Sequence, residues 1–341
     1  MKNVPAGYLH PSAAYTIKRA QIKRYQYLDK VPEAGDVVYG RVVALGHHRY
    51  LENCHGRIHS LLDGSRAVFV YGNRYAPDHY EGAVPDSPSA TVDLLARSGV
   101  VGVVRQRNSV LQHPTRIRVL GYVSDASGRM LNTRDYPLIT PRGHVKKTHR
   151  SKMILVIGTS MNSGKSITAA ACCWALAAMG HTVRASKITG TASLKDILRM
   201  NDSGASVVND FTHLGHPSTY LLDETELLHI FNRIDLKYAN SPKNYWVVEL
   251  ADGILQRETE MLLASRDVQS RIYRLVFSAS DALGCVGGLT VLRERFGLEP
   301  DAISGVCSSS PLARQELERF TSIPVFNNME CDLKQISELV L

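Results

Sequence analysis

Hydrophobic and polar positions divide the chain into two stretches of different pattern. Between residues 37 and 123, short runs rich in Val, Tyr and Arg alternate with turn residues such as Gly46, Gly64 and Gly72. Short runs of this kind separated by turn residues are typical of β-strands joined by tight turns. From residue 153 onward, apolar runs of strand length alternate with helical patterns, which indicates parallel βαβ units. We therefore expect a small β-rich domain followed by an α/β domain.

The first stretch is predicted to contain one helix and four strands. The helix is expected over residues 13–28 and has a basic face. The strands are expected over residues 37–45, 67–71, 100–105 and 116–123. Four short strands with tight turns predict a small β-barrel or sandwich. The opening residues GDVVYGRVVAL resemble an S1- or SH3-like barrel.

The second stretch is predicted to form a doubly wound, mostly parallel sheet with helices on both faces. Its expected strands are residues 153–157, 182–187, 245–249, 273–278, 303–307 and 323–326. Its expected helices are residues 165–179, 219–232, 254–265, 284–296, 311–320 and 332–340. Residues 146–152 are basic, lack apolar periodicity and are interpreted as a linker. The predicted domains are therefore residues 1–145 and 153–341.

Composition excludes several classes of protein. The 341 residues are 44% hydrophobic and 21% charged, a balance typical of folded domains rather than disordered chains. No run reaches the roughly 18 apolar residues that a membrane-spanning helix needs, and the N-terminus lacks the apolar core of a secretory signal. The six cysteines have no framework spacing. Reduced thiols in the cytoplasm are therefore expected.

The net charge of +8 is distributed unevenly. Residues 1–150 carry 22 Lys and Arg against 11 Asp and Glu, whereas residues 151–341 carry 18 against 21. This asymmetry either indicates that the first half meets an anionic partner, nucleic acid included, or only keeps the surface soluble.

Histidines near the N-terminus are dense enough to suggest a metal site. They lack the paired spacing of a zinc site, so we interpret them as ordinary residues of strands and turns rather than as metal ligands. The group consists of His47, His48, Cys54, His55 and His59.

The strongest local signal is a glycine-rich loop between a strand and a helix. The apolar run 153–157 leads into GTSMNSGKS, and an alanine-rich helical pattern follows. Backbone N–H groups of such a loop bind phosphate together with the helix N-terminus, so a nucleotide site is predicted. Lys165 is expected to reach the β- and γ-phosphates and Ser166 to ligate Mg²⁺. The expected nucleotide contacts are Gly158, Thr159, Ser160, Met161, Asn162, Ser163, Gly164, Lys165, Ser166 and Ile167.

Five residues separate Gly158 from Gly164, where the common phosphate-binding loop has four. The form G-T-x-x-x-x-G-K-[ST] resembles dethiobiotin synthetase and its relatives in the SIMIBI class of P-loop NTPases, which includes the nitrogenase iron protein and MinD. The second lysine of MinD-type dimers, early in the loop, is absent here, which favours the synthetase-like branch. The resemblance covers about residues 153–326. ATP and Mg²⁺ are the expected cofactors, and a homodimer or other homo-oligomer is expected.

Further matches to this family follow the predicted strands. In this family a Lys-Pro…Ser-Gly segment at the end of the second strand places a lysine next to the substrate and the γ-phosphate. The corresponding segment here is SKITGT, so the resemblance gives this role to Lys187, although the proline is missing. The family's V-V-E-G-A-G-G segment is VVELADG here, which makes Glu249 a metal-binding carboxylate by resemblance. Asp252 replaces a family glycine and is a candidate for orienting a Mg²⁺-bound water or the substrate. The expected catalytic residues are Lys165, Lys187, Glu249 and Asp252.

The family also has a Mg²⁺-binding aspartate between its second and third strands. Asp210, which follows a short apolar run, is preferred over Asp202 for this role. The expected metal ligands are then Ser166, Asp210 and Glu249. His213 and His216 follow in a loop that is a candidate substrate clamp or a simple surface loop.

The sequence does not settle which base is bound. The guanine motif Asn-Lys-x-Asp is absent, and Ser-Ala-Ser-Asp281 keeps only its aspartate. In the family an asparagine after the fifth strand contacts adenine; residues 308–310 are serines here. Adenine is expected from the resemblance, with hydroxyl groups in place of the amide.

Three functions remain open. The first is an ATP-dependent enzyme that activates a small carboxylate or carbamate, an anionic acceptor, as the resemblance implies. The second is a kinase on RNA or a nucleotide that binds through the basic N-terminal half, where eleven tyrosines offer stacking surface. The third is a nucleotide-driven switch or scaffold ATPase. The first is the preferred hypothesis.

Overall fold

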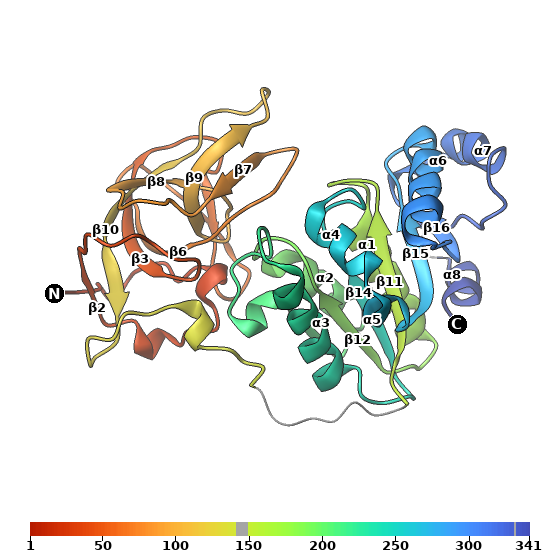
Figure 1. Ribbon diagram of the computed structural model, residues 1–341, viewed down its shortest axis with the longest axis horizontal. Coiled ribbons are helices and arrows are strands. Elements are labelled where there is room, and N and C mark those ends of the chain that lie inside the picture. The colour runs from red at the N-terminus through yellow and green to blue at the C-terminus, as the bar shows by residue number, and fades with distance from the viewer. Residues whose placement is uncertain (141–148, 331) are drawn as a thin grey trace. The chain divides into compact units, whose positions relative to one another are not determined.

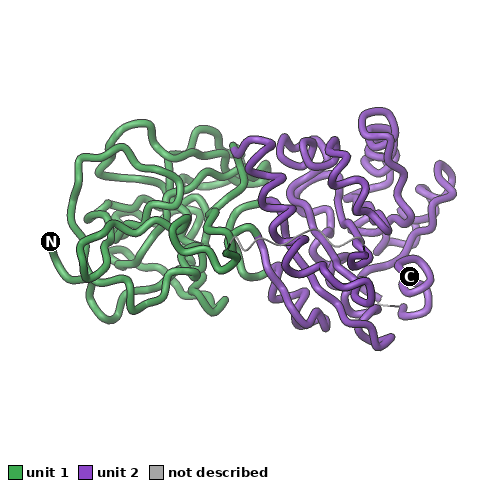
Figure 2. The backbone as a smooth tube through the Cα atoms, turned by 60° about the horizontal axis from the view of Figure 1, so that its bottom comes forward, with its two compact units in different colours: residues 1–140, 190–195, 211–221 green, residues 141–189, 196–210, 222–341 purple. Residues whose placement is uncertain are grey.

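The structure is a computed structural model that describes residues 1–140, 149–330 and 332–341 (Figure 1). These residues cluster into two compact units. The first contains residues 1–140 together with 190–195 and 211–221, and the second contains the other described residues (Figure 2). The sequence analysis had assigned residues 190–195 and 211–221 to the second domain. The first unit is therefore built from three separate segments of the chain.

Five strands of the first unit pair in a closed ring. Four of them are the strands predicted from the sequence, which confirms those predictions, and β8 was not predicted. In ring order they are β3 (Val37–Ala44), β6 (Arg66–Tyr71), β9 (Val100–Arg107), β8 (Thr91–Leu94) and β10 (Arg116–Ser124). Three shorter strands extend this sheet: β1 (Lys2–Asn3), β2 (Arg24–Gln26) and β7 (Tyr80–Ala83). Two others, β4 (Tyr50–Glu52) and β5 (Ile58–Ser60), form a separate antiparallel pair.

The helix predicted over residues 13–28 does not form. Two 3₁₀ turns, η1 (Ser12–Ala14) and η2 (Arg19–Gln21), precede β2 instead. Ile17 and Ile22 are both buried in one cluster with Tyr39 and Val68. Five positions place two side chains roughly 140° apart around a helix of 3.6 residues per turn. A helix would therefore turn one of the two isoleucines away from this cluster.

Residues 190–195 and 211–221 are held within the first unit by specific contacts. Ala192 is buried in a cluster with Ala14 and Val70. The Thr133 hydroxyl donates to the carbonyl of Gly215 at 2.7 Å. The buried carboxylate of Glu52 accepts from the Leu194 N–H at 3.0 Å and so caps the start of α2 (Leu194–Asp202). Another turn of the unit is η3 (Thr133–Asp135), and η4 (Phe211–Leu214) lies in the later segment.

The second unit is a sheet of six parallel strands in the described residues. Their order across the sheet is β13 (Val207–Asp210), β12 (Val183–Lys187), β14 (Tyr245–Glu249), β11 (Lys152–Gly158), β15 (Ile272–Ser278) and β16 (Ala302–Ser304). Besides α2, its helices are α1 (Lys165–Ala178), α3 (Glu224–Tyr238), α4 (Arg257–Ala264), α5 (Arg266–Gln269), α6 (Ala282–Val291), α7 (Pro311–Glu318) and α8 (Leu333–Val340). The π-helical turn η5 (Leu292–Phe296) continues α6, and η6 (Val306–Ser308) follows β16.

Most elements predicted for this unit are present, with two shortened strands. The strand expected over 303–307 ends at Ser304, because Gly305 has φ +103°, outside the range of a strand. Of the strand expected over 323–326, only Val325 bridges to the sheet, at Ile303. The helices α2 and α5 were not predicted.

The connections of this sheet run in opposite directions from its centre. The chain moves from β11 toward β12 on one side, and from β14 toward β15 on the other. Because such connections are right-handed, helices cover both faces of the sheet, as expected of a doubly wound fold. β11 and β14 are neighbours, so the direction changes between them. Ligands of open α/β sheets bind at the carboxyl ends of the strands at this point.

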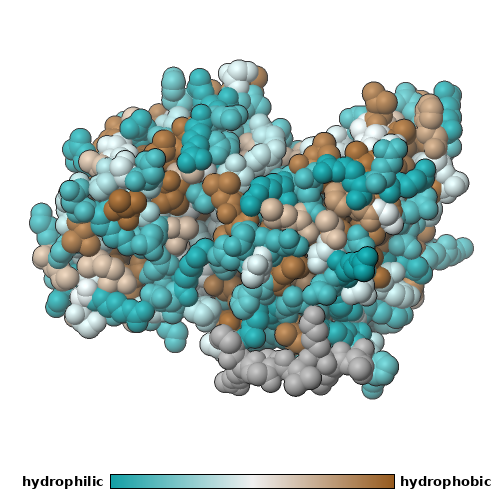
Figure 3. Space-filling model, viewed as in Figure 1, coloured by the Kyte–Doolittle hydropathy of each residue, from teal (hydrophilic) through white to brown (hydrophobic). Residues whose placement is uncertain are grey.

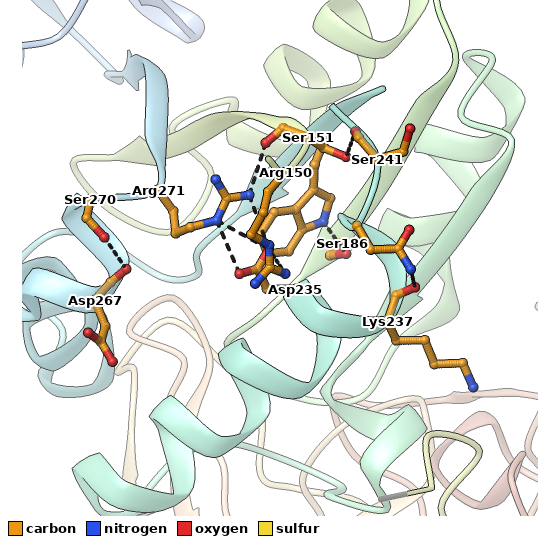
Figure 4. A network of polar contacts seen from close by, with 11 residues as sticks. Arg150, Ser151, Ser186, Asp235, Lys237, Ser241, Asp267, Ser270 and Arg271 are labelled. Atoms are coloured by element: carbon orange, nitrogen blue, oxygen red, sulfur yellow. Dashed lines mark hydrogen bonds and ion pairs between the residues drawn. The ribbon is translucent and has the colours of Figure 1, made fainter. Parts of the chain in front are cut away.

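A buried carboxylate joins the start of β11 to α3 and β15. Asp235 is 1% exposed and pairs with Arg150 at 2.7 Å and with Arg271 at 3.2 Å (Figure 4). Arg271 also donates to the carbonyl of Ser151 at 3.0 Å. Of the predicted linker, residues 146–148 lie outside the described residues. Residues 150–152 belong to the second unit, because Arg150 is held by this ion pair and Lys152 begins β11.

Asp235→Ala is expected to lower the free energy of unfolding by about 3–5 kcal/mol, because it leaves two guanidinium groups without their buried counter-charge. Urea denaturation measures this loss. Asp267→Ala, at an exposed position of α5, is the matched control and should change stability by no more than about 0.5 kcal/mol. Equal effects of the two substitutions would contradict a structural role for Asp235.

No helix in the part of the chain that the structure describes is long and apolar enough to cross a membrane. On the face shown in Figure 3, hydrophobic side chains lie in scattered groups among hydrophilic ones. Other large apolar side chains are buried in the cores of the two units, as Phe69 and Trp246 are.

Candidate nucleotide site

The glycine-rich loop lies between β11 and α1, as predicted. Gly158 ends the strand, and Lys165 is the first residue of the helix. Asn162 and Gly164 have φ values of 62° and 98°, which turn the loop back toward the helix. Gly164 tolerates no side chain, since a Cβ atom there would lie 2.8 Å from the Cα atom of Gly305. Strand, loop and helix together form a phosphate-binding loop.

Two neighbouring loops hold this loop in place through their backbones. A Cβ atom on Gly253, after β14, would lie 2.3 Å from the carbonyl oxygen of Thr159. The Val306 N–H, after β16, donates to the carbonyl of Ser163 at 3.2 Å. Glycines at 253 and 305 permit this close approach. The phosphate-binding loop is therefore fixed by the ends of three strands.

The Lys165 side chain is buried beneath the loop. Its Nζ atom donates to the carbonyl of Ser160 at 2.6 Å and to the Ser163 hydroxyl at 3.4 Å. Burial lowers the pKa of Lys165, while the negative charge of Glu249 opposes that shift. Carbonyl and hydroxyl oxygens supply less counter-charge than a phosphate would. An anion in the loop would therefore find a cation already in place.

Lys187 and Glu249 lie side by side at the carboxyl ends of β12 and β14. The two residues are paired in register, and Lys187 Nζ is 3.7 Å from Glu249 Oε1. Lys187 also forms an ion pair with Asp196 of α2. Burial disfavours the charged form of Lys187, but Asp196 and Glu249 outweigh that effect and raise its pKa above the ordinary value. Lys187 is therefore a buried cation.

Glu249 connects this lysine to the phosphate-binding loop. Its Oε1 atom accepts from the Ser166 hydroxyl at 2.8 Å, and its Oε2 atom is buried without a hydrogen-bond partner. A hydroxyl and a carboxylate are oxygen ligands that Mg²⁺ prefers, and an unpartnered buried carboxylate oxygen fits a cation. No group of three or more His, Cys, Asp or Glu side chains in the described residues is arranged to hold a metal. Mg²⁺ would thus be held by Ser166, Glu249 and nucleotide oxygens.

Asp210, the third expected metal ligand, lies two strands away from Glu249. It pairs in register with Lys187, which stands on the strand between them. Neighbouring strands are about 4.8 Å apart, so the Cα atoms of Asp210 and Glu249 are separated by roughly 10 Å. The alternative candidate, Asp202, is the exposed last residue of α2. The structure does not bring Asp210 together with Ser166 and Glu249 as a metal-binding group.

Asp252, the remaining expected catalytic residue, follows Ala251 in the loop after β14. Its charge acts on both Lys165 and Lys187. The carbonyl of Ala251 accepts from the hydroxyls of Thr189 at 2.5 Å and Thr259 at 2.7 Å, which fixes the loop. Asp252 is therefore near both lysines.

The sequence analysis missed Asp196, the carboxylate that contacts Lys187. The available signal was the segment SLKDILRM, in which an acidic residue stands in the first turn of a helix close after the Lys187 strand. It also missed Asn328, whose amide donates to Thr168 of α1 at 2.9 Å.

Other candidate residues have local roles. His213 belongs to the first unit, where its Nδ1 atom is 2.7 Å from the Tyr15 hydroxyl. Asp281 caps α6 through the Gly284 N–H at 2.7 Å, which explains the aspartate after β15. Ser308 and Ser309 donate to nearby backbone carbonyls, and Ser310 caps α7 by accepting from the Ala313 N–H.

The N-terminal histidines do not surround a metal in the described residues. His47 and His48 instead gather with His79, which the sequence analysis had not included, and Arg74 donates to His48 at 2.8 Å. Burial and the Arg74 charge lower the pKa of His48 to about 3 and that of His79 to about 4. The cluster is thus held neutral.

Fold and loop together define a P-loop nucleotide-binding unit. No family model matches this chain, and the comparison with curated proteins finds no match. Solved structures similar to it include a ParA family ATPase from Chlorobium tepidum TLS, with 13% identity and a TM-score of 0.35 over 56% of this chain and 89% of that chain. Another is the signal recognition particle receptor FtsY from Elizabethkingia anophelis, with 12% identity and a TM-score of 0.34 over 60% of this chain and 70% of that chain. The same receptor in complex with GDP has a TM-score of 0.33.

Proposed function

We propose that this chain is a Mg²⁺-dependent, ATP-binding enzyme that brings a small anionic acceptor, a carboxylate or carbamate, to the γ-phosphoryl group. The observation that carries this proposal is Lys187, a buried cation at the carboxyl end of β12, next to Glu249 at the carboxyl end of β14. Lys187 pairs with Asp196 and with Glu249, and Glu249 in turn accepts from Ser166 next to the phosphate-binding loop. The dethiobiotin synthetase-like resemblance gives Lys187 the same role.

The residues of this chain would act by position and charge. Phosphoryl transfer depends on alignment of the reacting oxygens and on neutralisation of charge. Lys165 would bind the β- and γ-phosphates, and Lys187 would hold the acceptor anion against the γ-phosphoryl group. Mg²⁺, when bound, would neutralise charge on the phosphate oxygens. Asp196 would keep the Lys187 ammonium oriented, and Asp252 would orient the acceptor or a water.

Lys187→Met tests this assignment. Nucleotide affinity should stay within about threefold of wild type, while acceptor-stimulated phosphate release should fall by about 100-fold, because the lysine acts on the transferred group rather than on nucleotide binding. Lys152→Met is the control, since Lys152 lies at the opposite end of the sheet strands and contacts Tyr245. Thermal melts establish that both variants fold.

Bicarbonate and short-chain mono- and dicarboxylates serve as acceptor probes. The proposal requires at least one of them to accelerate phosphate release by wild type. A slow release that no probe accelerates, and that Lys187→Met leaves unchanged, would contradict the proposal. That result would favour the nucleotide-driven switch or scaffold ATPase.

A further inference from the structure

Three arginines form a row across adjacent strands of the first unit. Arg41 of β3 is paired in register with Arg66 of β6 on one side and with Arg118 of β10 on the other. Residues paired in this way point to the same face of a sheet, and neighbouring strands are about 4.8 Å apart. All three side chains are exposed. The Cα atoms of the three arginines therefore lie within a span of roughly 10 Å.

No carboxylate neutralises this row among the described residues. The ion pairs of the unit join other residues, including Arg116 to Asp93 at 3.3 Å and Arg129 to Asp135 at 2.9 Å. Asp63, in the turn before β6, is the acidic residue closest to the row in sequence, and it forms no ion pair with it. Like charges placed directly opposite each other on a sheet are destabilising. The row costs the fold stability, and an anionic partner would relieve that cost.

Aromatic and apolar side chains adjoin the row on the same face. Tyr39 lies two residues before Arg41, and its ring contacts that of Tyr25, which is half-buried, at 4.9 Å. Arg66 lies close enough to the Tyr39 hydroxyl to oppose the rise in its pKa that burial causes. Val43, two residues beyond Arg41, is 40% exposed. Tyr39 itself is buried, so Tyr25 is the partly exposed ring beside the row. A cationic surface next to a partly exposed aromatic ring is a combination that binds single-stranded nucleic acid.

We propose that the Arg66–Arg41–Arg118 row is a binding surface for the phosphate backbone of a single-stranded nucleic acid. Guanidinium groups match phosphate with two parallel hydrogen bonds, and the row consists of arginines alone. The excess of 22 basic over 11 acidic residues in positions 1–150 would attract such a chain over a longer range. The proposal is independent of the function assigned to the nucleotide site.

Binding is measured without nucleotide by fluorescence anisotropy, using fluorescein-labelled oligouridylate and oligodeoxythymidylate of about 20 nucleotides. Each phosphate contact on a single strand contributes about 0.7 to the slope of log affinity against log salt. The triple variant Arg41→Gln, Arg66→Gln, Arg118→Gln should therefore lower the slope by about 2 and weaken binding at least tenfold. Arg41→Gln alone should lower the slope by about 0.7.

The matched control removes three arginines of the second unit, two exposed and one half-buried, which are paired with Glu299, Glu260 and Glu318. Its substitutions are Arg293→Gln, Arg295→Gln and Arg314→Gln. It changes the net charge equally but should leave the slope unchanged. The triple variant of the row should melt no lower than wild type, because it removes like charges that face each other.

Three results would overturn the proposal. One is the absence of oligonucleotide binding by wild type at low salt. Another is an equal loss of binding in the control variant, which would show attraction by net charge alone. The third is preference of the row for oligoglutamate over both oligonucleotides, which would identify an acidic protein segment as the partner.

Discussion

Lys165→Ala is expected to abolish measurable nucleotide binding while the protein remains folded. In the structure Lys165 Nζ makes its contacts to Ser160 and Ser163 of the loop. In a bound nucleotide the same group would contact phosphate oxygens. Charge-assisted hydrogen bonds contribute about 1.5–3 kcal/mol each, so losing these contacts should reduce affinity at least 100-fold. Calorimetric titration with MgATP and MgGTP measures this loss and also determines which nucleotide is preferred.

The control for this variant is Lys334→Ala, at an exposed position in the first turn of α8. It removes the same charge and should leave affinity within about twofold, since an exposed charge outside the site is screened by solvent. Urea denaturation should show that both variants fold cooperatively. Unchanged nucleotide affinity in Lys165→Ala would contradict the assignment of the phosphate-binding loop.

The nucleotide-binding loop could be predicted because its determinants are contiguous. A buried strand, two glycines within the seven residues before the helix, and the pair Lys165-Ser166 stand next to one another in the sequence. Each of them acts locally: the glycines set the backbone and the helix N-terminus attracts the anion. Glu249 and Lys187 could be placed for a related reason. The carboxyl ends of parallel strands meet at one edge of the sheet.

Asp196 could not be found in this way because its role depends on tertiary structure. It reaches Lys187 only because α2, which begins at Leu194, places its first turn at the carboxyl end of β12. The segment that leads into this helix packs with the first unit, where Ala192 is buried and Glu52 caps the helix. Apolar and polar patterns reveal that a residue is buried, but not which core buries it.

The helix predicted over residues 13–28 was wrong for a related reason. Residues 13–17 have helical spacing over a single turn, and the basic residues beyond them suggested a continuing face. Burial of Ile22 in the same cluster as Ile17, and pairing of Tyr25 with Val123, require an extended chain instead. Pairing between residues 98 positions apart overrides a local preference that is worth less than about 1 kcal/mol per residue.

Glu249→Gln is expected to separate nucleotide binding from turnover. The amide keeps the shape of the side chain and an oxygen that accepts from Ser166, so binding without Mg²⁺ should change by less than about threefold. It removes the negative charge on the buried oxygen that has no hydrogen-bond partner. Mg²⁺ prefers charged oxygen ligands, so Mg²⁺-dependent turnover should fall by about 100-fold.

Magnesium titration distinguishes this outcome from a structural effect. If Glu249 holds Mg²⁺, raising its concentration should partly restore turnover in Glu249→Gln, because weaker metal binding is overcome by mass action. Glu260→Gln is the control, because the Glu260 carboxylate pairs with Arg295 and not with the nucleotide site. Its turnover should need no more Mg²⁺ than that of wild type. Lys187 should remain charged in Glu249→Gln, since Asp196 still pairs with it. Turnover within about threefold of wild type at every Mg²⁺ concentration would exclude Glu249 from the metal site and leave it as the carboxylate that positions Lys187.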